Sequence, residues 1–508
     1  MLFNLRANNI FQIKLAPKHK VNTSYTSLLT FSKYKDKFTN AKVKNEKEII
    51  YVEQDLITRT NQYIATPKPS SIRIFNELLM NKNNQKLDES RKLFLIMFAS
   101  YFIESTLFFT NPKDNKSIFS QYGYNTSLYG ITKEVEYYLR QPNESGKLVT
   151  DSNNMAPTIL NIENFHGKVP EHILPTIYKT TKDKHHFIGG KKDLNRNPAH
   201  YYFNSLFLRE HNRICNQLKK HYPSKNGEWY FTKAMHFTHL ILWKIVYKEY
   251  VLHGLSGYHN SNFRYTKKYT NISTSYNRKL LLYGLGAKNM KNGTIPFEFN
   301  LAYRWHLLLP ALTKINDTPV SLEQMQTLTF IQNNTIEDVF LSWLQQPSLC
   351  LHHNNTSSDM KHVIIATINR AREMNVDSFN NVRAGFGLPK YSSFEDYTSN
   401  VEIREILSSL YDDIDSMDFY VGIWFEEKQQ SNYIFPETMI VILASYAIIY
   451  DIAFIDLFDS EVKKSPETKI IWKNLDTSLC ALLERNTDLD KETLEKYDIH
   501  SMGRKKSN

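Results

Sequence analysis

The sequence predicts a mainly α-helical fold built around one large core. Three stretches indicate helices: an almost unbroken apolar run at 93–109, a long stretch at 228–260, and Glu298–Pro310 with its apolar face. The run at 93–109 is at the lower length limit for a membrane span. Glu104 near its centre would cost about 2.5–3.5 kcal/mol in a bilayer. We therefore expect a buried helix there rather than a transmembrane one.

The composition is that of a basic, aromatic-rich globular protein. The chain has 508 residues, a formal net charge of +11, 31 tyrosines and 30 phenylalanines. Its lysines and arginines are dispersed and no nucleic-acid motif accompanies them, so no nucleic-acid partner is expected. The three cysteines, Cys215, Cys350 and Cys480, are odd in number and far apart. No disulfide framework is therefore predicted.

The two ends of the chain differ from its centre. Residues 1–70 are polar, rich in lysine and weakly patterned, and the first eleven lack the sustained apolar core of a signal peptide. A cytoplasmic location and a peripheral one on a membrane both stay open. Residues 71–490 form the predicted domain, in which 111–185 has the composition of long surface loops. Residues 491–508 are expected to be a disordered basic tail.

Three side chains of the stretch at 298–310 could carry chemistry: Tyr303, Trp305 and His306. A neutral imidazole can ligate a metal through one nitrogen when the other nitrogen has a hydrogen-bond acceptor. Tyr303 lies three residues earlier, on nearly the same face of the expected helix. A phenol so close to a ligated metal could be oxidised to a radical. The alternative is a buried pair satisfied by ordinary hydrogen bonds.

The motif E-F-N-x-x-Y-x-W-H followed by L-x-P resembles the proximal helix of the cyclooxygenases and related fatty-acid dioxygenases, within the animal haem peroxidase superfamily. This resemblance implies a helical fold with haem b between a distal helix at 93–109 and a proximal helix at 298–310. By position, His306 would be the proximal iron ligand. Tyr303 would carry the radical that removes hydrogen from a fatty acid, with Trp305 beside the cofactor.

Two further motifs extend the resemblance. The segment Leu208-Arg-Glu-His-Asn-Arg213 is close to a signature of the superfamily, and we expect it to be structural, with Glu210 in buried ion pairs and His211 not a ligand. The segment beginning at Phe379 matches F-N-x-x-R. In related peroxidases this asparagine accepts a hydrogen bond from the proximal histidine. That role would fall on Asn380, with Arg383 near the haem.

The distal side departs from the family pattern. The distal glutamine and histidine fall on Ser100 and Glu104, and a distal arginine found in many animal peroxidases falls on Asp193. A carboxylate can act as a general base, although its reach differs from that of an imidazole. Glu104 is therefore the candidate distal catalytic group, together with Tyr303.

The resemblance also places a substrate channel. The match to E-Y-V-x-H-L-S-G-Y, interrupted near Gly254, implies a carboxylate-contacting tyrosine at the channel mouth. It falls on Tyr258, with three further residues on the wall: Tyr250, Leu255 and Ser256. The family arginine that pairs with the substrate carboxylate falls near Phe11, where Arg6 is the nearest guanidinium, and we assign no residue to that role.

The opposite wall of the channel is expected in the helix after Glu437. The serine acetylated by aspirin falls on Ala447, and two glycines that make room for the fatty acid fall on Leu443 and Tyr450. Large side chains at these positions remove volume that a fatty acid of about twenty carbons needs. The channel is then shortened, rerouted or closed.

The resemblance implies an oxidoreductase similar to prostaglandin-endoperoxide synthase, which dioxygenates a polyunsaturated fatty acid and has linked peroxidase chemistry. Its partners would be the fatty acid and dioxygen or peroxide, with a homodimer and a peripheral membrane contact as further expectations. Two alternatives stay open because a fold does not fix a function. One is a haem peroxidase-type enzyme that uses Glu104, and the other is a catalytically silent binding protein. Haem content separates the last from the other two.

Overall fold

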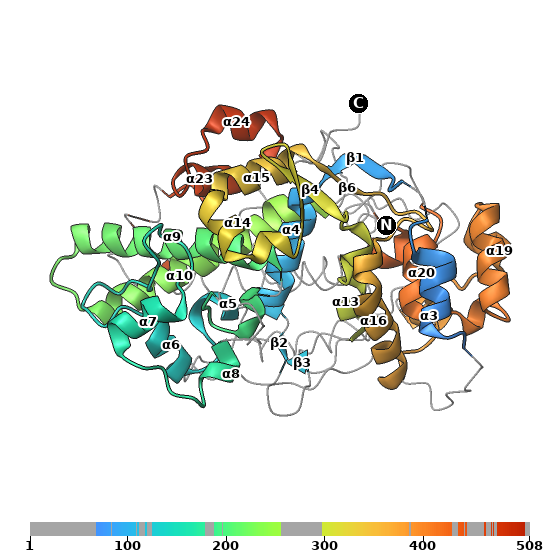
Figure 1. Cartoon of the computed structure of the whole chain (residues 1–508), viewed down its shortest axis with the longest axis horizontal. Coiled ribbons are helices and arrows are strands. Elements are labelled where there is room, and N and C mark those ends of the chain that lie inside the picture. Colours follow the sequence, from blue (N-terminus) through green and yellow to red (C-terminus); the bar gives the residue numbers. More distant parts are fainter. Residues whose placement is uncertain are drawn as a thin grey trace, which may run out of the picture.

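A computed structural model gives the structure of the chain. It describes residues 68–82, 84–107, 109–110, 117–118, 124–177, 187–195, 197–255, 297–385, 388–428, 435–440, 442–443, 462–463, 469, 471 and 475–502. The expected polar segment at 1–70 falls almost wholly outside these residues. Most of the described residues are helical (Figure 1), which confirms the predicted fold class.

The core is organised around helix α4 (Leu93–Phe102), which lies near the centre of the molecule (Figure 1). Every residue of α4 except Ser100 is buried. A helix that is apolar on all sides must be enclosed by other elements. Phe94 accordingly contacts Phe203 and Phe340 edge-on, with ring centroids 5.3 and 5.7 Å apart. The expectation of a buried helix at this position is confirmed.

Two long helices, α9 (Pro198–His221) and α10 (Gly227–Ile245), pack against each other on one side of α4 (Figure 1). Each begins at an asparagine whose side chain accepts a hydrogen bond from the first turn, and α9 also has proline at its first position. The five-residue turns of η4 (Val246–Leu255) continue α10. The long helix predicted from the sequence is therefore confirmed as far as Leu255.

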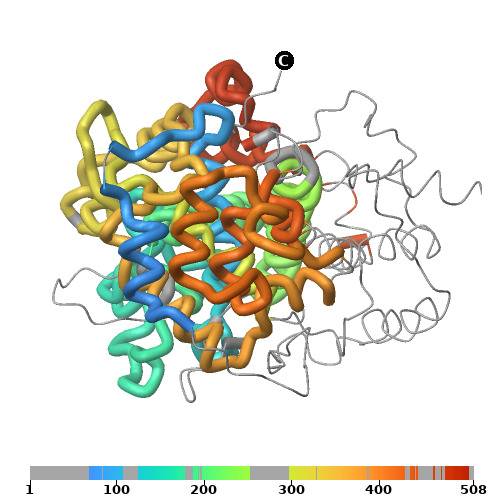
Figure 2. The backbone as a smooth tube through the Cα atoms, turned by 90° about the vertical axis from the view of Figure 1, so that its right-hand side faces the viewer, coloured from blue at the N-terminus to red at the C-terminus, as the bar shows by residue number. Residues whose placement is uncertain are grey.

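A second group of helices lies on the other side of α4 and faces the viewer in Figure 2. It comprises α3 (Ser71–Ile74), η1 (Phe75–Leu79), α13 (Phe297–Ala302), α16 (Lys361–Glu373), α17 (Phe379–Gly385), α18 (Phe394–Tyr397), α19 (Val401–Leu410) and α20 (Phe419–Phe425). Helix α20 contacts α13, α16 and α17. Gly422 permits the close contact with α17, because an added Cβ would lie 2.3 Å from a ring carbon of Phe379.

The strands of the described residues form three small antiparallel pairs. They are β1 (Leu87–Lys92) with β6 (Pro347–Leu349), β2 (Phe109–Thr110) with β3 (Ser117–Ile118), and β4 (Leu312–Ile315) with β5 (Thr318–Ser321). Asn316 and Asp317 join β4 to β5 with φ angles of 49° and 62°, the backbone that a two-residue hairpin turn requires. The β1–β6 pair fixes the start of α4 beside the end of α15 (Ile336–Gln345), which α14 (Leu328–Asn333) precedes.

Two expectations about irregular segments need correction. The stretch 111–185 contains short helices: α5 (Thr126–Tyr129), α6 (Lys133–Leu139), α7 (Ile159–His166) and α8 (Leu174–Ile177). Side-chain caps at Asn125 and Thr132 start the first two, which outweighs the loop-like composition.

The tail also differs from its expectation. Residues 475–502 hold α23 (Leu479–Glu484), α24 (Lys491–Lys496) and η10 (Ile499–Ser501). The tail is ordered as far as Met502 because Leu494, Ile499 and Met502 are fully buried. Those three apolar side chains anchor a segment whose other residues are mostly polar.

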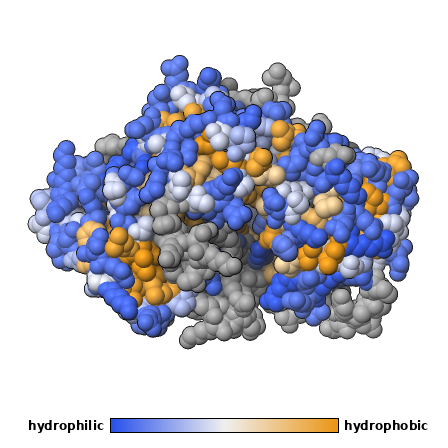
Figure 3. All heavy atoms as spheres, viewed as in Figure 1, coloured by the Kyte–Doolittle hydropathy of each residue, from blue (hydrophilic) through white to orange (hydrophobic). Residues whose placement is uncertain are grey.

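The surface seen in Figure 3 is mainly hydrophilic, with scattered apolar groups and a larger apolar area over the α6–α8 region. Leu160 and Phe165 of α7 are 64% and 45% exposed. No helix in the described part of the chain combines the length and the apolar character of a membrane span. Cys215, Cys350 and Cys480 are free thiols, as predicted.

The Leu208–Arg213 signature is structural, as expected. Glu210 is fully buried and accepts hydrogen bonds from Arg213 at 2.8 and 2.9 Å, from Arg485 at 3.0 Å and from the Asn486 amide at 2.7 Å. Burial raises the pKa of this carboxyl, but the two guanidinium groups outweigh burial and lower the pKa to about 2. Glu210 therefore fastens α9 to the C-terminal segment.

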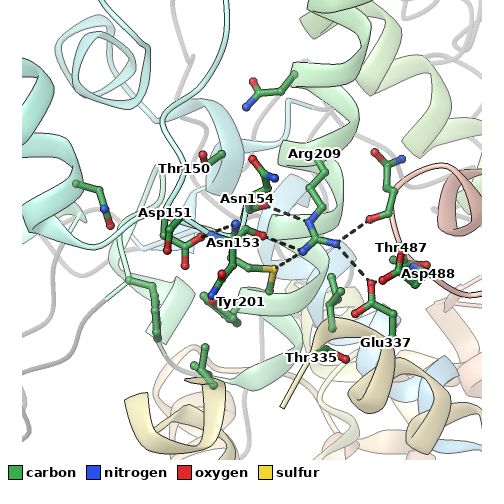
Figure 4. Close-up of a pocket in the computed structure, with 18 of the residues that line it drawn as sticks. Thr150, Asp151, Asn153, Asn154, Tyr201, Arg209, Thr335, Glu337, Thr487 and Asp488 are labelled. Carbon is green, nitrogen blue, oxygen red and sulfur yellow. Dashed lines mark hydrogen bonds and ion pairs between the residues drawn. The ribbon is translucent and has the colours of Figure 1, made fainter. Parts of the chain in front are cut away.

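The neighbouring Arg209 performs a similar task in a polar cavity of about 1060 Å³ between α9, the 151–155 loop and the C-terminal segment (Figure 4). Its guanidinium donates hydrogen bonds to the carbonyls of Asn153, Asn154 and Asn486 at 2.8–3.1 Å and lies 3.7 Å from the Glu337 carboxylate. His211 bonds to Tyr129 and to the Gly146 carbonyl, and burial lowers the pKa of its ring to about 4.

Replacing Glu210 tests whether its carboxylate fastens α9 to the C-terminal segment. The folded-state pKa lies below the usual value of 4.5, so the carboxylate stabilises the fold above about pH 4.5 and this stabilisation is lost as the pH falls towards 2. Glu210→Gln should lower the free energy of unfolding at pH 7 by about 3–5 kcal/mol, because two partly buried guanidinium groups lose the buried carboxylate that pairs with them. Urea titrations at pH 7 and pH 3 should show a smaller difference between variant and wild type at pH 3.

Glu337→Gln is the matched control, since Glu337 is partly exposed and lies 3.7 Å from Arg209. Its effect on unfolding should stay below about 1 kcal/mol. Equal effects of the two substitutions at pH 7 would contradict a structural role centred on Glu210.

Candidate functional site

The expected single helix at 298–310 is broken in its middle. Helix α13 ends at Ala302, Tyr303 lies in a turn, and η6 (Trp305–Leu308) follows. Arg304, with φ −83° and ψ 65°, interrupts the helical backbone. The Tyr303 N–H is shared between the carbonyls of Phe299 and Asn300, both at 3.2 Å, which tightens the last turn. Tyr303 and His306 are therefore placed by a turn, not by one helical face.

Long-range contacts hold this break in place. The Tyr420 hydroxyl donates a hydrogen bond to the Arg304 carbonyl at 2.9 Å, and the Arg304 guanidinium donates to the Asn300 side chain at 2.9 Å. The Trp305 indole N–H donates to the Ala302 carbonyl at 2.6 Å, which caps the end of α13. We call residues 303–306 the proximal turn.

Tyr303 lies in an aromatic enclosure. Its side chain is 6% exposed. Its ring is stacked on Trp305, with centroids 5.1 Å apart and an interplanar angle of 12°, and Phe299 covers it at 4.9 Å. The phenol is thus held against two aromatic rings and away from bulk solvent.

The aromatic contacts continue from the proximal turn to α4. Trp305 lies 6.4 Å from Tyr250 of η4, and Tyr250 lies 5.5 Å from Phe98 and 5.9 Å from Phe102 of α4, measured between ring centroids. Three residues that the sequence assigned to separate roles, Tyr303, Trp305 and Tyr250, are therefore brought together. The proximal turn and the distal helix share one packed aromatic cluster.

The pattern of exposure fits a cofactor between these two segments. In the fully described stretch 93–106, only Ser100 and Glu104 are partly exposed, and they are one turn apart. In the stretch 297–310, also fully described, only Arg304 and His306 are partly exposed. The positions at which the sequence predicted the distal pair and the proximal ligand are thus open within otherwise buried elements. An imidazole is a common haem-iron ligand, so the residues present fit haem on the proximal side.

Glu104 lies in η2 (Ile103–Leu107), a five-residue turn that continues α4. Turns of this kind inside helices occur frequently at functional sites. One turn earlier, the Ser100 hydroxyl accepts a hydrogen bond from the Asn197 amide at 3.1 Å. The distal face therefore carries a carboxylate and a bonded hydroxyl in place of an imidazole and an amide.

Lys191 is a residue that sequence reasoning missed. It is 3% exposed, and its ammonium group donates a hydrogen bond to the backbone carbonyl of Glu104. That carbonyl belongs to the last turn of the distal helix, where carbonyls lack partners within the helix and a cation is favourable. The adjacent lysines before Asp193 were the available signal. The side chain of Asp193 itself lies outside the described residues.

Asn380 and Arg383 of α17 make different contacts from those expected. The Asn380 amide donates to the Tyr391 carbonyl at 2.9 Å and to Asp415 at 3.0 Å, and its oxygen accepts from the Tyr391 N–H at 3.0 Å. These bonds attach the 389–391 segment to α17. The oxygen expected to accept from the proximal histidine thus already serves a backbone N–H.

Arg383 is fully buried within a cluster of acids. Its guanidinium is paired with Glu426 and, at 2.7 Å, with Glu437, and it donates a further hydrogen bond to Thr438 at 2.7 Å. Burial lowers the pKa of Arg383, but Glu426 together with Tyr391 and Glu437 outweighs burial, so the net shift is upward. These contacts make Arg383 a tie between α17 and the segment around 437. Its place near the haem stays a prediction.

The predicted channel residues are only partly described. Tyr250 and Leu443 are buried, at 0% and 2% exposure. Phe435, near Leu443 in the chain, packs on Trp305 with centroids 4.7 Å apart. Phe435 therefore adjoins the proximal turn. The channel wall itself stays a prediction. The Leu255 side chain and the remaining predicted channel residues, Ser256, Tyr258, Ala447 and Tyr450, lie outside the described residues.

No group of three or more histidine, cysteine or acidic side chains arranged for a metal ion occurs within the described residues. A single-histidine haem ligand would not form such a group, so the finding bears only on ions held by the protein alone.

The model of the animal haem peroxidase family matches residues 118–493 of this chain. The chain therefore belongs to the animal haem peroxidase family. Prostaglandin G/H synthase 2 of Gallus gallus is 28% identical over 400 residues, which cover 75% of this chain and 60% of that protein. Prostaglandin G/H synthase 1 of Rattus norvegicus is 32% identical over 257 residues, 49% of this chain and 39% of the relative. The chain thus spans at most about 60% of these relatives.

Solved structures show the same fold at lower identity. The fatty acid alpha-dioxygenase of Oryza sativa gives a TM-score of 0.63 at 16% identity, covering 86% of this chain and 81% of that chain. Peroxidase A of Dictyostelium discoideum gives 0.62 at 17% identity, covering 86% and 93%. The predicted haem-peroxidase fold is confirmed.

Replacing Lys191 tests whether its hydrogen bond to the Glu104 carbonyl stabilises the end of the distal helix. Lys191→Met removes a buried charge-assisted hydrogen bond to the Glu104 carbonyl, so the free energy of unfolding should fall by about 1.5–3 kcal/mol. Lys191→Arg should recover most of the loss. Lys192→Met, at the adjacent and partly exposed lysine, is the matched control and should change stability by less than about 0.5 kcal/mol. Urea denaturation gives all three values, and equal losses for Lys191→Met and Lys192→Met would contradict the assignment.

Proposed function

We propose that the protein is a haem-dependent oxidoreductase that dioxygenates a fatty acid through a radical on Tyr303. One observation carries this proposal. A buried tyrosine stacked on tryptophan lies three residues from a partly exposed histidine, on a turn that shares an aromatic cluster with the distal helix. Family membership and the similarity to prostaglandin synthases support it.

His306 is the proposed axial ligand, and haem b would supply the oxidising power that amino-acid side chains lack. Ligation requires a neutral imidazole that presents one nitrogen to iron. His306 is suited to this because it is partly open, while Trp305, Leu307 and Leu308 around it are buried and fix the backbone of η6.

Tyr303 is the proposed hydrogen-abstracting group. Its radical would take a hydrogen atom from a carbon of the substrate, which remakes the phenol O–H bond and leaves a carbon radical to which dioxygen adds. Polyunsaturated fatty acids suit this step because a C–H bond between two double bonds is weak. The rings of Trp305 and Phe299 exclude water and so protect the radical from quenching.

Glu104 is the proposed proton acceptor on the distal side. Its carboxylate would take the proton of a hydroperoxide, the task of a general base. The hydrogen bond from Lys191 to its carbonyl fixes the backbone from which the carboxylate extends. A carboxylate on a fixed backbone would thus take the place of the imidazole found in the family.

A second candidate is a haem peroxidase that oxidises small donors and binds no fatty acid. The observation in its favour is Leu443, which is buried at 2% exposure beside Met439 and Ile442 at the position where channel volume was expected. Oxygen uptake by haem-loaded protein with linoleic acid, compared with oxidation of a small phenol, separates the two. Uptake favours the dioxygenase, and phenol oxidation without uptake favours the peroxidase.

Haem titration tests whether the protein binds haem through His306. Purified protein should give a Soret band with haem at a one-to-one ratio. His306→Ala should lose it or weaken haem binding by about 100-fold, a loss typical of a missing metal ligand or its supporting contacts. Tyr303→Phe should keep it, because the phenol is not the ligand.

His221→Ala is the matched control, since His221 is exposed and, among the described residues, its ring hydrogen-bonds to the Gln217 carbonyl of its own helix. It should bind haem as the wild type does. A wild-type protein without any Soret band would overturn both enzyme readings and leave a silent binding protein.

A further inference from the structure

We infer that the polar cavity between α9, the 151–155 loop and the C-terminal segment is a binding site for a neutral saccharide (Figure 4). Among the described residues, none from the distal helix or the proximal turn lines this cavity, so it is separate from the proposed site of oxidation. Its volume of about 1060 Å³ matches the largest small-molecule pockets, which reach about 1,000 Å³. Two sugar rings therefore have room in it.

The arginines around the cavity are already neutralised. Arg213 and Arg485 are paired with the buried Glu210 at 2.8 and 2.9 Å. Arg209 lies 3.7 Å from the Glu337 carboxylate and donates hydrogen bonds to three backbone carbonyls. The other charged residues of the lining carry both signs: Lys147, Asp151 and Asp488. An anion or a cation would bring a charge that lacks a counter-charge, so the site favours a neutral ligand.

Much of the uncharged lining consists of hydroxyl and carboxamide side chains. They come from the 151–155 loop and the residue before it, from α9 and from α14, and include Thr150, Ser152, Asn153, Asn216, Gln332 and Asn333. Each of these groups can both donate and accept hydrogen bonds. The hydroxyl groups of a sugar have the same double capacity, so the lining and a saccharide are complementary.

Tyr201 adds a donor that has no partner. It lines the cavity (Figure 4), its side chain is 3% exposed, and its hydroxyl makes no hydrogen bond with any residue that the structure describes. Burial raises the pKa of this phenol and the Asp151 carboxylate raises it further, so the O–H group stays protonated at neutral pH. A buried hydroxyl without a partner is unfavourable. A sugar oxygen that accepts from Tyr201 would remove this cost.

The cavity also offers an aromatic contact. Phe187 and Tyr201 both line it, with ring centroids 4.2 Å apart. The face of an aromatic ring is electron-rich and attracts the C–H groups on one side of a sugar ring. A saccharide uses both the polar groups and the rings, whereas a free phosphate or a small carboxylate uses neither the rings nor the neutral charge balance.

Saturation-transfer NMR on the full-length protein tests the site. The probes are maltose and diacetylchitobiose as neutral disaccharides, citrate as an anion, and N-acetyl-triglycine amide as a neutral peptide. Wild type should bind at least one disaccharide more tightly than citrate or the peptide. Tyr201→Phe should weaken that disaccharide by about 2- to 10-fold, the loss expected for one neutral hydrogen bond. Its thermal unfolding without ligand should not fall below that of wild type, because the lost hydroxyl has no described partner.

Tyr202→Phe is the matched control for the hydroxyl. Tyr202 is the next residue and is also buried, and its hydroxyl likewise makes no hydrogen bond with a described residue, but it packs on Trp343 and does not line the cavity. Its affinity for the disaccharide should equal that of wild type.

A second pair of variants locates the bound sugar. Asn216 is exposed on α9 and lines the cavity, so Asn216→Trp should fill part of the space and abolish the saturation-transfer signal. Gln217 is also exposed on α9 but does not line the cavity, and Gln217→Trp should retain the signal.

Three results would overturn the inference. If wild type binds neither disaccharide, the cavity holds only water. If citrate or the peptide binds more tightly than both disaccharides, the site is one for anions or for peptides. If Asn216→Trp binds the disaccharide as well as wild type does, the sugar binds elsewhere on the protein.

Discussion

The stacking of Tyr303 on Trp305 across the helix break at Arg304 is the interaction on which the site depends. An unbroken helix would put residues 303 and 306 on one face and residue 305 on another. The break instead lets the rings of residues 303 and 305 lie parallel, 5.1 Å apart. It also exposes His306 from an otherwise buried segment. The helix break thus encloses the Tyr303 phenol and leaves the His306 imidazole partly exposed.

The rest of the structure holds that break in place. The Tyr420 hydroxyl bonds to the Arg304 carbonyl from α20, and α20 packs tightly on α17 through Gly422. The buried pairs of Arg383 with Glu426 and Glu437 then fasten α17 to the segment that carries Phe435. Because Phe435 packs on Trp305, the charge cluster and the aromatic cluster support each other. Removing one charge from such a cluster costs far more than its net contribution to stability.

The sequence predicted what depends on local pattern and on a specific motif. The apolar run at 93–109 was expected to be a buried helix rather than a membrane span because of Glu104, and α4 is buried at every residue except Ser100. The motif around His306 identified the family, which the comparisons confirmed. The motif could not reveal the break at Arg304, because a hydroxyl 116 residues away helps to fix it.

Partners distant in the chain also explain the other differences. The Asn380 amide is directed by Tyr391 and Asp415, and Arg383 by two acids more than forty residues later. Lys191 was missed because its role depends on burial and on its contact with the Glu104 carbonyl. No pattern of spacing encodes these contacts.

In the proposed function, Tyr303 is the residue that carries the radical. Electron paramagnetic resonance of haem-loaded protein, frozen after mixing with an organic hydroperoxide, measures this directly. We expect a tyrosyl signal that Tyr303→Phe abolishes and Tyr202→Phe retains. Tyr202 is the suitable control because it is also buried and its hydroxyl makes no hydrogen bond with any residue that the structure describes. A signal of unchanged shape and intensity in Tyr303→Phe would contradict a radical on Tyr303.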